Sequence, residues 1–196
     1  GLPNLPGVLT KARSYAERLF EYRPIGRLND TAVADGFQKP ARELGYSFDD
    51  EALARLVDLS HGYPYFIQAY GKASWDASDS NPISVSAVEK GEPVARAGLD
   101  QGLYVSRWQR ATPLGREYLA AMAAIGETCT SAQVAKLMNR SVSDLSSIRL
   151  SLIELGLVYS PERGRIAFTV PGMDEFIRRV MPSESQSYDG RALKGD

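Results

Sequence analysis

The stretch that decides the fold runs from Ile153 to Pro171 and reads IELGLVYSPERGRIAFTVP. It opens with the apolar end of a predicted helix, and Gly156 stands where helices commonly end. Two short runs of β-prone residues follow, separated by SPERGR, which contains the proline and glycine typical of turns. The pattern predicts a β-hairpin. It is either the closing hairpin of a small domain or the wing of a DNA-binding module.

Two helices are predicted upstream of this stretch. The first begins at Thr112 and Pro113, an N-cap followed by proline at the first helical position, and it ends at Gly126. The second is short and opens with a capping box from Thr130 to Gln133. Both are expected to pack their apolar residues into one core.

A third helix directly precedes the hairpin and begins with Ser141 and Asp144. Its apolar residues recur at helical spacing and form the expected buried stripe, namely Leu145, Ile148, Leu152 and Leu155. A last helix follows the hairpin, with apolar residues Met173, Phe176, Ile177 and Val180. This is the element order of a winged helix, in which the third helix reads DNA and the hairpin is the wing.

The first half of the chain is predicted to be a helical bundle without a sheet. Helices are expected over residues 5–20 and 29–44, in a third segment that ends at Gly62, and in a fourth that starts at Pro64. The fold class that follows is mainly α: a lid-like helical bundle followed by a winged-helix domain (helix-turn-helix plus β-hairpin wing).

The domain boundaries follow from composition. Small, polar and helix-breaking residues from Ala77 to Pro82 mark a boundary, and a connecting helix is expected from about Pro93 to Gln109. The chain opens without Met and reads like a loop between two elements, which indicates a fragment of a longer protein. The expected segments are 1–28, a helical lid at 29–80, the connection at 81–111, the winged helix at 112–181 and a disordered tail at 182–196.

Arginines and hydroxyl groups surround the predicted recognition helix and wing. They could meet DNA phosphates and a few base edges. The candidate DNA-binding residues are Asn139, Arg140, Ser143, Ser146, Ser147, Arg149, Arg163 and Arg165.

Charge favours this interpretation only weakly. From Thr112 to Met181 eight Lys and Arg residues stand against seven Asp and Glu residues, so DNA affinity should be low and sensitive to salt. Leu150 also points away from the expected buried stripe, which suits a protein contact better than a base contact. A winged helix that docks a protein therefore stays open as the alternative.

Composition and motifs give no support to catalysis by this chain. The overall charge is balanced, with 23 Lys and Arg against 24 Asp and Glu, and so it does not indicate binding to nucleic acid or to an acidic membrane. One cysteine, Cys129, suits a reducing cytoplasm and a small apolar role, and His61 has no acid or nucleophile near it in sequence. There is no phosphate-binding GxxxxGK[ST] loop, no metal-binding spacing of Cys and His, and no membrane-spanning apolar segment. We therefore expect no catalytic residue, metal or cofactor in this chain.

The segments YAERLFEYRPIGRL, GYPYFIQAYGKASWD and LIELGLVYSPERGRIAFTVPGMDEFIRR resemble the C-terminal region of AAA+/STAND-type ATPases related to origin-recognition initiators. The resemblance implies that residues 1–28 end the ATPase core, and that a helical lid and a winged helix follow. It also implies that the parent protein binds ATP and Mg²⁺ with motifs that precede residue 1.

Two further sites are implied by the same resemblance. Gly62, Tyr63 and Pro64 resemble the GxP motif by which such lids approach nucleotide, and a helix N-terminus after Pro64 would favour an anion. A C-terminal helix glycine followed by a first-turn proline explains these residues equally well. Many relatives have an arginine where this chain has Tyr65. Arg18 lies near the position of an arginine finger in oligomeric relatives, although a solvated helix face is the simpler explanation.

Three functions are therefore carried forward. The leading expectation is the lid and winged-helix part of an ATPase that couples its nucleotide state to double-stranded DNA binding, with the ATPase core as partner and a possible homo-oligomer. The second is a switch ATPase whose winged helix docks protein. The third is a transcriptional regulator that holds an effector in an apolar pocket lined by Tyr63, Tyr65 and Phe66. All three are expected in the cytoplasm.

Overall fold

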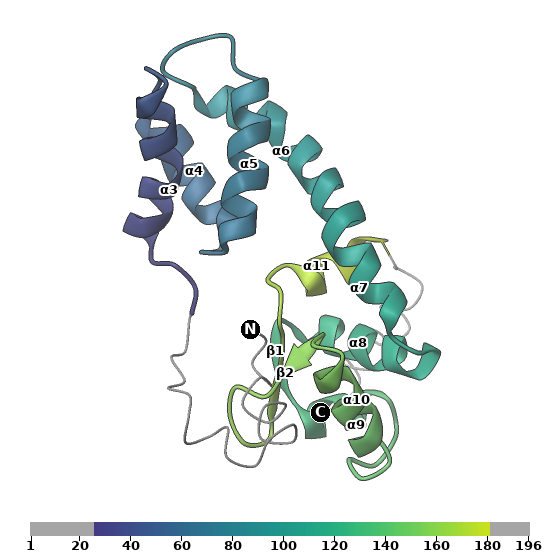
Figure 1. Ribbon diagram of the computed structural model, residues 1–196. Coiled ribbons are helices and arrows are strands. Elements are labelled where there is room, and N and C mark those ends of the chain that lie inside the picture. Colours follow the sequence, from purple (N-terminus) through teal and green to yellow (C-terminus); the bar gives the residue numbers. More distant parts are fainter. Residues whose placement is uncertain (1–25, 181–196) are drawn as a thin grey trace, which may run out of the picture. The chain divides into compact units, whose positions relative to one another are not determined.

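The computed structural model describes residues 26–180, which fall into two compact units of residues 26–103 and 104–180 (Figure 1). We call them the N-terminal unit and the C-terminal unit. Three expectations concern other residues. Most of the segment 1–28, the arginine finger Arg18 within it, and the tail at 182–196 lie outside the described residues.

Local sequence signals set the helices of the N-terminal unit. Asn29 caps the first of them by accepting the N–H of Ala32 at 2.8 Å, and Asp49 caps the next by accepting the N–H of Ala52 at 2.7 Å. Pro64 occupies the first turn of the third, as predicted. The helices are α3 (Asp30–Glu43), α4 (Asp50–Ser60), α5 (Pro64–Asp76) and α6 (Val85–Leu99).

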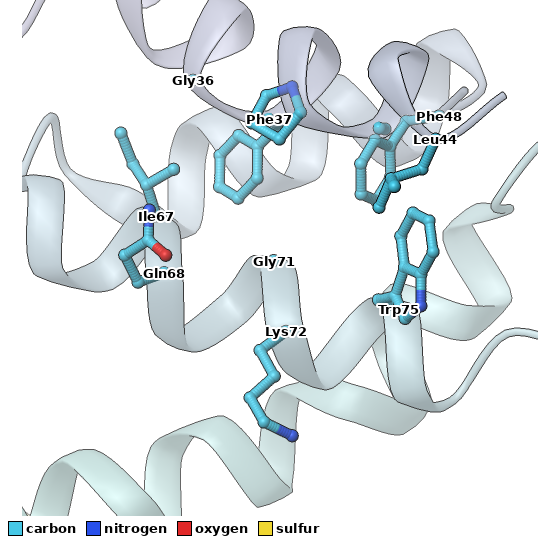
Figure 2. A pocket seen from close by; sticks show the side chains of 11 residues that line it. Gly36, Phe37, Leu44, Phe48, Ile67, Gln68, Gly71, Lys72 and Trp75 are labelled. Atoms are coloured by element: carbon cyan, nitrogen blue, oxygen red, sulfur yellow. The ribbon is translucent and has the colours of Figure 1, made fainter. Parts of the chain in front are cut away.

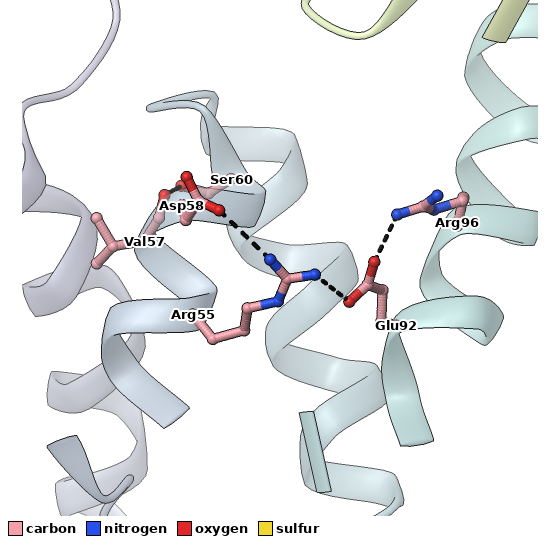
Figure 3. Close-up of polar contacts among 6 residues, drawn as sticks. All are labelled: Arg55, Val57, Asp58, Ser60, Glu92 and Arg96. Atoms are coloured by element: carbon pink, nitrogen blue, oxygen red, sulfur yellow. Dashed lines mark hydrogen bonds and ion pairs between the residues drawn. The ribbon is translucent and has the colours of Figure 1, made fainter. Parts of the chain in front are cut away.

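Helix α6 packs tightly into this bundle. A Cβ atom placed on Gly91 of α6 would lie 2.6 Å from the backbone of Ala73 in α5, so the two helices approach at a position that only glycine allows. Figure 3 shows the polar link on another side: Arg55 of α4 donates to the carboxylate of Glu92 at 2.8 Å, and Arg96 pairs with the same carboxylate. Helix α6 is therefore part of the N-terminal bundle.

This packing corrects the expected connecting helix. The helix begins at Val85 rather than near Pro93, and Pro93 lies inside it. A proline interrupts one backbone hydrogen bond of a helix, and the contacts of α6 with α4 and α5 outweigh that loss. The segment 81–111 is consequently divided between the two units instead of forming a separate connection.

The predicted boundary at Ala77 to Pro82 also lies within the N-terminal unit. The side-chain amide of Asn81 donates to the carbonyl of Gly45 at 3.0 Å and accepts the N–H of Ser47 at 3.1 Å. Phe48 and Ile83 then form an isolated parallel β-bridge. The polar segment that was predicted to be a linker therefore connects the start of α6 to the loop between α3 and α4 by hydrogen bonds.

The C-terminal unit follows a π-helical turn, η1 (Asp100–Tyr104). Its elements are α7 (Val105–Arg110), α8 (Pro113–Ile125), β1 (Thr128–Thr130), α9 (Ser131–Leu137), α10 (Ser146–Glu154), β2 (Val158–Tyr159), β3 (Arg165–Phe168) and α11 (Met173–Val180). The expected third helix starts later than predicted, at Ser146. Ser141 and Asp144 exchange hydrogen bonds in the turn before it.

The strands form a three-stranded antiparallel sheet in the order β1-β3-β2. Thr128 lies opposite Ala167, and Val158 lies opposite Phe168. The β2–β3 hairpin was predicted. Strand β1 was not, because the run Thr128 to Thr130 is too short to show an alternating pattern.

The core of the C-terminal unit gathers around α8. Tyr118, Leu119 and Met122 of α8 are fully buried, as are Phe176 and Ile177 of α11. Of the predicted stripe on α10 and the turn before it, Leu145 and Leu152 are buried, whereas Ile148 and Leu155 are only half-buried. The coarse fold class is confirmed: the described chain is mainly helical, with one small antiparallel sheet.

No helix within residues 26–180 combines the length and the apolar character that crossing a membrane requires.

Candidate functional site

A tight turn closes the β2–β3 hairpin, which we define as residues 158–168. The backbone N–H of Arg165 donates to the carbonyl of Glu162 at 3.1 Å. Gly164 has a φ of 81°, a value that β-turns with glycine in the third position require. Arg163, the second residue of the turn, is exposed and forms no ion pair with another residue of the segment 26–180. The tip of the hairpin therefore presents a guanidinium group that is available to a ligand.

Ser160 connects this hairpin to α10. Its Oγ lies 2.8 Å from the carbonyl oxygens of both Glu162 and Arg165, and it accepts a hydrogen bond from Nη2 of Arg149 at 3.1 Å. Sequence reasoning missed Ser160. A serine directly before a proline at the end of a strand is a signal for such a side-chain-to-backbone turn.

Helix α9 supports the hairpin at a second point. The N–H of Ser131 donates to the carbonyl of Gly164 at 3.1 Å. Ser131 lies within the predicted capping box, which is confirmed: Thr130 Oγ1 accepts the N–H of Gln133 at 3.2 Å, and Gln133 Oε1 accepts the N–H of Thr130 at 2.8 Å. The hairpin tip is thus held by both α9 and α10.

Arg149 is a residue of α10, and its half-buried side chain reaches the hairpin. Its Nη2 is bonded to Ser160, and its Nε is buried with no hydrogen-bond partner among the described residues. Burial raises the pKa of the nearby Tyr118 phenol, as does the thiol of Cys129, while the positive charge of Arg149 partly offsets this rise. Arg149 was predicted at the edge of a DNA-facing surface, and the structure leaves its side chain half-buried, with Nε buried.

The other candidate residues of α9 and α10 face solvent. Asn139 has a left-handed conformation, with a φ of 53°, and both it and Arg140 are exposed. Ser143, Ser146 and Ser147 are exposed as well. The Ser146 hydroxyl donates to the carbonyl of Ser143 at 2.7 Å, so it has a local partner. These residues form one exposed polar segment that runs from the end of α9 into α10.

Charges in this segment are mixed. Hydrogen bonds from Ser141 hold the pKa of Asp144 below its usual value, and the charge of Arg140 adds to this effect. On the hairpin, Arg165 pairs with Glu162 at 3.7 Å, and both side chains are largely exposed. Such an exposed pair is weak, about 0–1 kcal/mol, so it leaves Arg165 able to bind an anion.

Two large apolar side chains interrupt the polar surface. Leu150 on α10 is 55% exposed, and Val142 in the turn before α10 is 49% exposed. Leu150 was predicted to point outward, and this is confirmed. Apolar groups at this position suit contact with a protein or with a thymine methyl group.

The Gly62, Tyr63 and Pro64 turn joins α4 to α5 in the N-terminal unit. A Cβ atom on Gly62 would lie 2.5 Å from the carbonyl oxygen of Leu28, and the N–H of Leu28 donates to the carbonyl of Gly62 at 2.9 Å. Gly62 also has a φ of 69°. Close approach and conformation therefore both require glycine here. No side chain caps the N-terminus of α5 at Tyr63.

An open depression of about 860 Å³ adjoins this turn, with Arg27, Asp30, Asp58, His61 and Gly62 among the residues that line it. It contains acidic groups as well as Arg27, so its charge does not single out an anion.

The apolar pocket expected around Tyr63, Tyr65 and Phe66 does not form from these three side chains together. Phe66 is buried and packs edge-on against Tyr63, with ring centres 5.1 Å apart, whereas Tyr65 is exposed.

A smaller hollow that the sequence did not predict lies between α3 and α5 (Figure 2). It measures about 200 Å³, and Phe37, Phe48 and Trp75 form much of its apolar lining. Leu44 at its rim is 67% exposed. Gly36 and Gly71 present no side chain towards this hollow, which keeps the two helices close.

Potential metal ligands and the lone cysteine are further candidates for a chemical site. No group of three or more His, Cys, Asp or Glu side chains within residues 26–180 could hold a metal ion. Cys129 is buried, and desolvation raises its pKa to about 11, so it is protonated near neutral pH and unsuited to act as a nucleophile.

Comparison with known proteins concerns the C-terminal unit. No curated protein matches the chain. Residues 101–177 match the family described as "Domain of unknown function (DUF8462)". The match covers less than half of the chain, and it begins in η1 and ends in α11. The similarity to this family therefore spans the segment that carries α10 and the β2–β3 hairpin.

Proposed function

We propose that the C-terminal unit is a winged helix that binds double-stranded DNA through α10 and the β2–β3 hairpin. The element order α8, β1, α9, α10, β2, β3, α11 supports this fold assignment, as does the strand order β1-β3-β2. In such domains a helix-turn-helix is followed by a hairpin that flanks the recognition helix. The bond between Arg149 and Ser160 supports that flanking arrangement here.

The observation that carries the proposal is the exposed guanidinium of Arg163 at the tip of a hairpin fastened to α10. Between Asp144 and Glu154, which are both exposed, α10 carries no acidic side chain, so a phosphate beside its first two turns meets hydroxyl groups. Arg140 is exposed just before this segment, and Arg165 is exposed on the hairpin. The arrangement offers phosphate contacts on both sides of a helix that bears hydroxyl groups.

The magnitude of binding follows from the number of phosphates neutralised. Three exposed arginines, Arg140, Arg163 and Arg165, give a salt slope of about −2 to −3, since each phosphate contact contributes about 0.9. Affinity for random duplex DNA is then weak at physiological salt and much stronger at low salt.

We further propose that the N-terminal unit is the lid of an ATP-binding AAA+/STAND-type ATPase, so that nucleotide state controls the DNA-binding unit. Support comes from the Gly62, Tyr63 and Pro64 turn, which precedes the uncapped N-terminus of α5. Free N–H groups and the helix dipole at such a terminus favour a phosphate. ATP, Mg²⁺ and an ATPase core are partners of the parent protein in this proposal.

Docking of a protein by the same surface is a second candidate. The exposure of Leu150 and Val142 favours it, because apolar side chains on a helix face commonly anchor protein contacts. In that case the winged helix binds an ATPase core or a second chain instead of DNA.

A titration distinguishes the two. The full chain is added to fluorescent random-sequence duplex DNA at low salt and at two higher salt concentrations. We expect micromolar binding that weakens steeply with salt. Absence of binding at low salt contradicts the DNA proposal and favours protein docking.

Two variants sharpen the result. Arg163→Ala removes a proposed phosphate contact and should flatten the salt slope by about 0.9. Leu150→Ser keeps every charge and should leave the slope unchanged. A slope unaltered by Arg163→Ala would mean that the hairpin tip does not contact phosphate.

A further inference from the structure

We propose that Arg149 is a positioning residue for duplex binding. It fixes the β2–β3 hairpin against α10 through Ser160, and the phosphate contact is made by Arg163. This inference rests on the proposed DNA-binding function and changes the role of one residue first predicted as a direct contact.

The environment of Arg149 carries the first part of the argument. Its side chain is half-buried, its Nη2 donates to Ser160 Oγ at 3.1 Å, and its Nε is buried. Of its five N–H groups, the one on Nε is buried and one on Nη2 is bonded to Ser160, and its charge acts on the buried phenol of Tyr118. Arginine is suited to this internal role because its planar group holds several donors in fixed directions.

The second observation concerns the hydrogen bonds of the Ser160 hydroxyl group. Its single hydroxyl hydrogen donates to the carbonyl of Glu162 or of Arg165, each 2.8 Å away, while the oxygen accepts from Arg149. The two carbonyl groups belong to the first and last residues of the turn that contains Arg163. One hydroxyl therefore couples α10 to both ends of that turn.

The remaining support is the bond from Ser131 to the carbonyl of Gly164. In this proposal, the bonds to α9 and α10 restrict the turn that contains Arg163. Loss of Arg149 or Ser160 removes the side-chain link to α10, whereas the bond to α9 and the pairing of β3 with β1 remain. Arg163 then keeps its charge but spends less time in the position that meets phosphate.

This distinction has a measurable signature. Loss of a positioning residue lowers affinity at every salt concentration, because it changes how often the bound geometry is populated. Loss of a phosphate contact lowers the salt slope as well, because fewer counterions are released. Affinity and slope together therefore separate the two roles.

The test compares four variants of the full chain: Arg149→Ala, Ser160→Ala, the double variant, and Arg163→Ala. Binding to a random-sequence duplex is titrated at three salt concentrations. We expect Arg149→Ala and Ser160→Ala each to weaken binding about five- to tenfold, a loss of about 1 to 1.4 kcal/mol. The double variant should bind no more weakly than the weaker single variant, since both remove one linkage.

Salt slopes complete the test. Arg149→Ala and Ser160→Ala should keep the wild-type slope, whereas Arg163→Ala should reduce it by about 0.9. Ser160→Ala is the matched control, because it breaks the link without changing any charge. Hydrogen exchange at the Arg165 amide provides an independent readout of hairpin fixation and should be faster in both single variants.

Other outcomes overturn the inference. A slope reduced by about 0.9 in Arg149→Ala, together with unchanged affinity in Ser160→Ala, identifies Arg149 as a direct phosphate contact. Additive losses in the double variant mean that the two residues act separately. If wild-type protein binds no duplex, the proposed function itself fails, whereas wild-type binding with either result above refutes only the positioning role. Urea unfolding of Arg149→Ala checks that the variant is folded, and Ser160→Ala keeps the test valid if it is not.

Discussion

Within each unit, taken by itself, a different kind of close contact stands out. In the N-terminal unit, backbone approaches backbone at glycines: Gly91 faces Ala73, and Gly62 faces Leu28. In the C-terminal unit, side chains donate across long sequence separations to backbone carbonyl groups. Examples are Tyr104 to Pro171 at 2.7 Å, Arg110 to Leu155 at 2.8 Å and Thr169 to Gly156 at 2.8 Å.

The comparison shows which changes each unit tolerates. A close approach of helices is disturbed by added atoms, because a Cβ has no room. A hydrogen bond from a side chain to a distant carbonyl is disturbed by removed atoms, because a buried carbonyl then loses its partner. The N-terminal unit should therefore be sensitive to enlargement at glycines, and the C-terminal unit to loss of polar groups.

The largest effect is expected from Gly91→Ala. Its new Cβ would lie 2.6 Å from the Ala73 backbone, so α5 and α6 must separate, at a cost of about 2–3 kcal/mol in unfolding free energy. Gly98→Ala in the same helix is the matched control, since no atom lies within 4 Å of its Cβ position. It should stabilise the protein by about 0.5–1 kcal/mol through helix propensity. Urea unfolding measures both, and equal effects would refute the close-approach argument.

Tyr104→Phe tests the C-terminal unit by removal of one oxygen. The buried hydroxyl donates to the Pro171 carbonyl, and loss of this bond should lower the unfolding free energy by about 1.5 kcal/mol. Ring stacking on Phe176 is retained, because the ring is unchanged. Tyr159→Phe is the control in the same unit, since no hydrogen bond of its hydroxyl is recorded among the described residues. A neutral Tyr104→Phe would show that the carbonyl finds another partner.

A smaller loss is expected from Thr130→Ala. Removal of the capping hydroxyl leaves the Gln133 N–H without its acceptor, which should cost about 1 kcal/mol. Thr128→Ala, an exposed position on β1, should cost less. Thermal or urea unfolding decides, and a larger loss for Thr128→Ala would mean that strand pairing dominates over the cap.

Cys129 should have no titration effect on stability near neutral pH. Burial raises its pKa from the ordinary thiol value to about 11, so the folded state keeps the proton to a higher pH than the unfolded state does. This contribution is fully present below about pH 9 and is lost as pH rises towards 11. The stability difference between wild type and Cys129→Ala should therefore be constant up to pH 9 and shrink above it. A constant difference through pH 11 would contradict the raised pKa.

Local signals in the sequence predicted much of the helical framework. Asn29, Pro64 and Thr130 mark helix starts through their own side chains or ring geometry, so they can be read without knowledge of the fold. Strand β1 could not be read in this way. Its three residues become a strand because β3, far along the chain, offers backbone partners.

The predicted helix start near Pro93 was wrong for a related reason. Pro93 is a helix breaker in isolation, but α6 continues through it because Gly91 and Glu92 bind the helix to its neighbours. At the candidate site, exposure of Arg140 and Arg163 could be predicted from polarity and turn chemistry. The bond between Arg149 and Ser160 could not be predicted, since it depends on where Ser160 lies relative to α10.

The small sheet has a consequence for how the protein behaves at high concentration. Its outer strands are β1 with three residues and β2 with two, while β3 is paired on both sides. Edges this short expose few free backbone groups for a second chain to pair with. The C-terminal unit is therefore protected against strand-to-strand aggregation, even though it presents its hairpin to solvent.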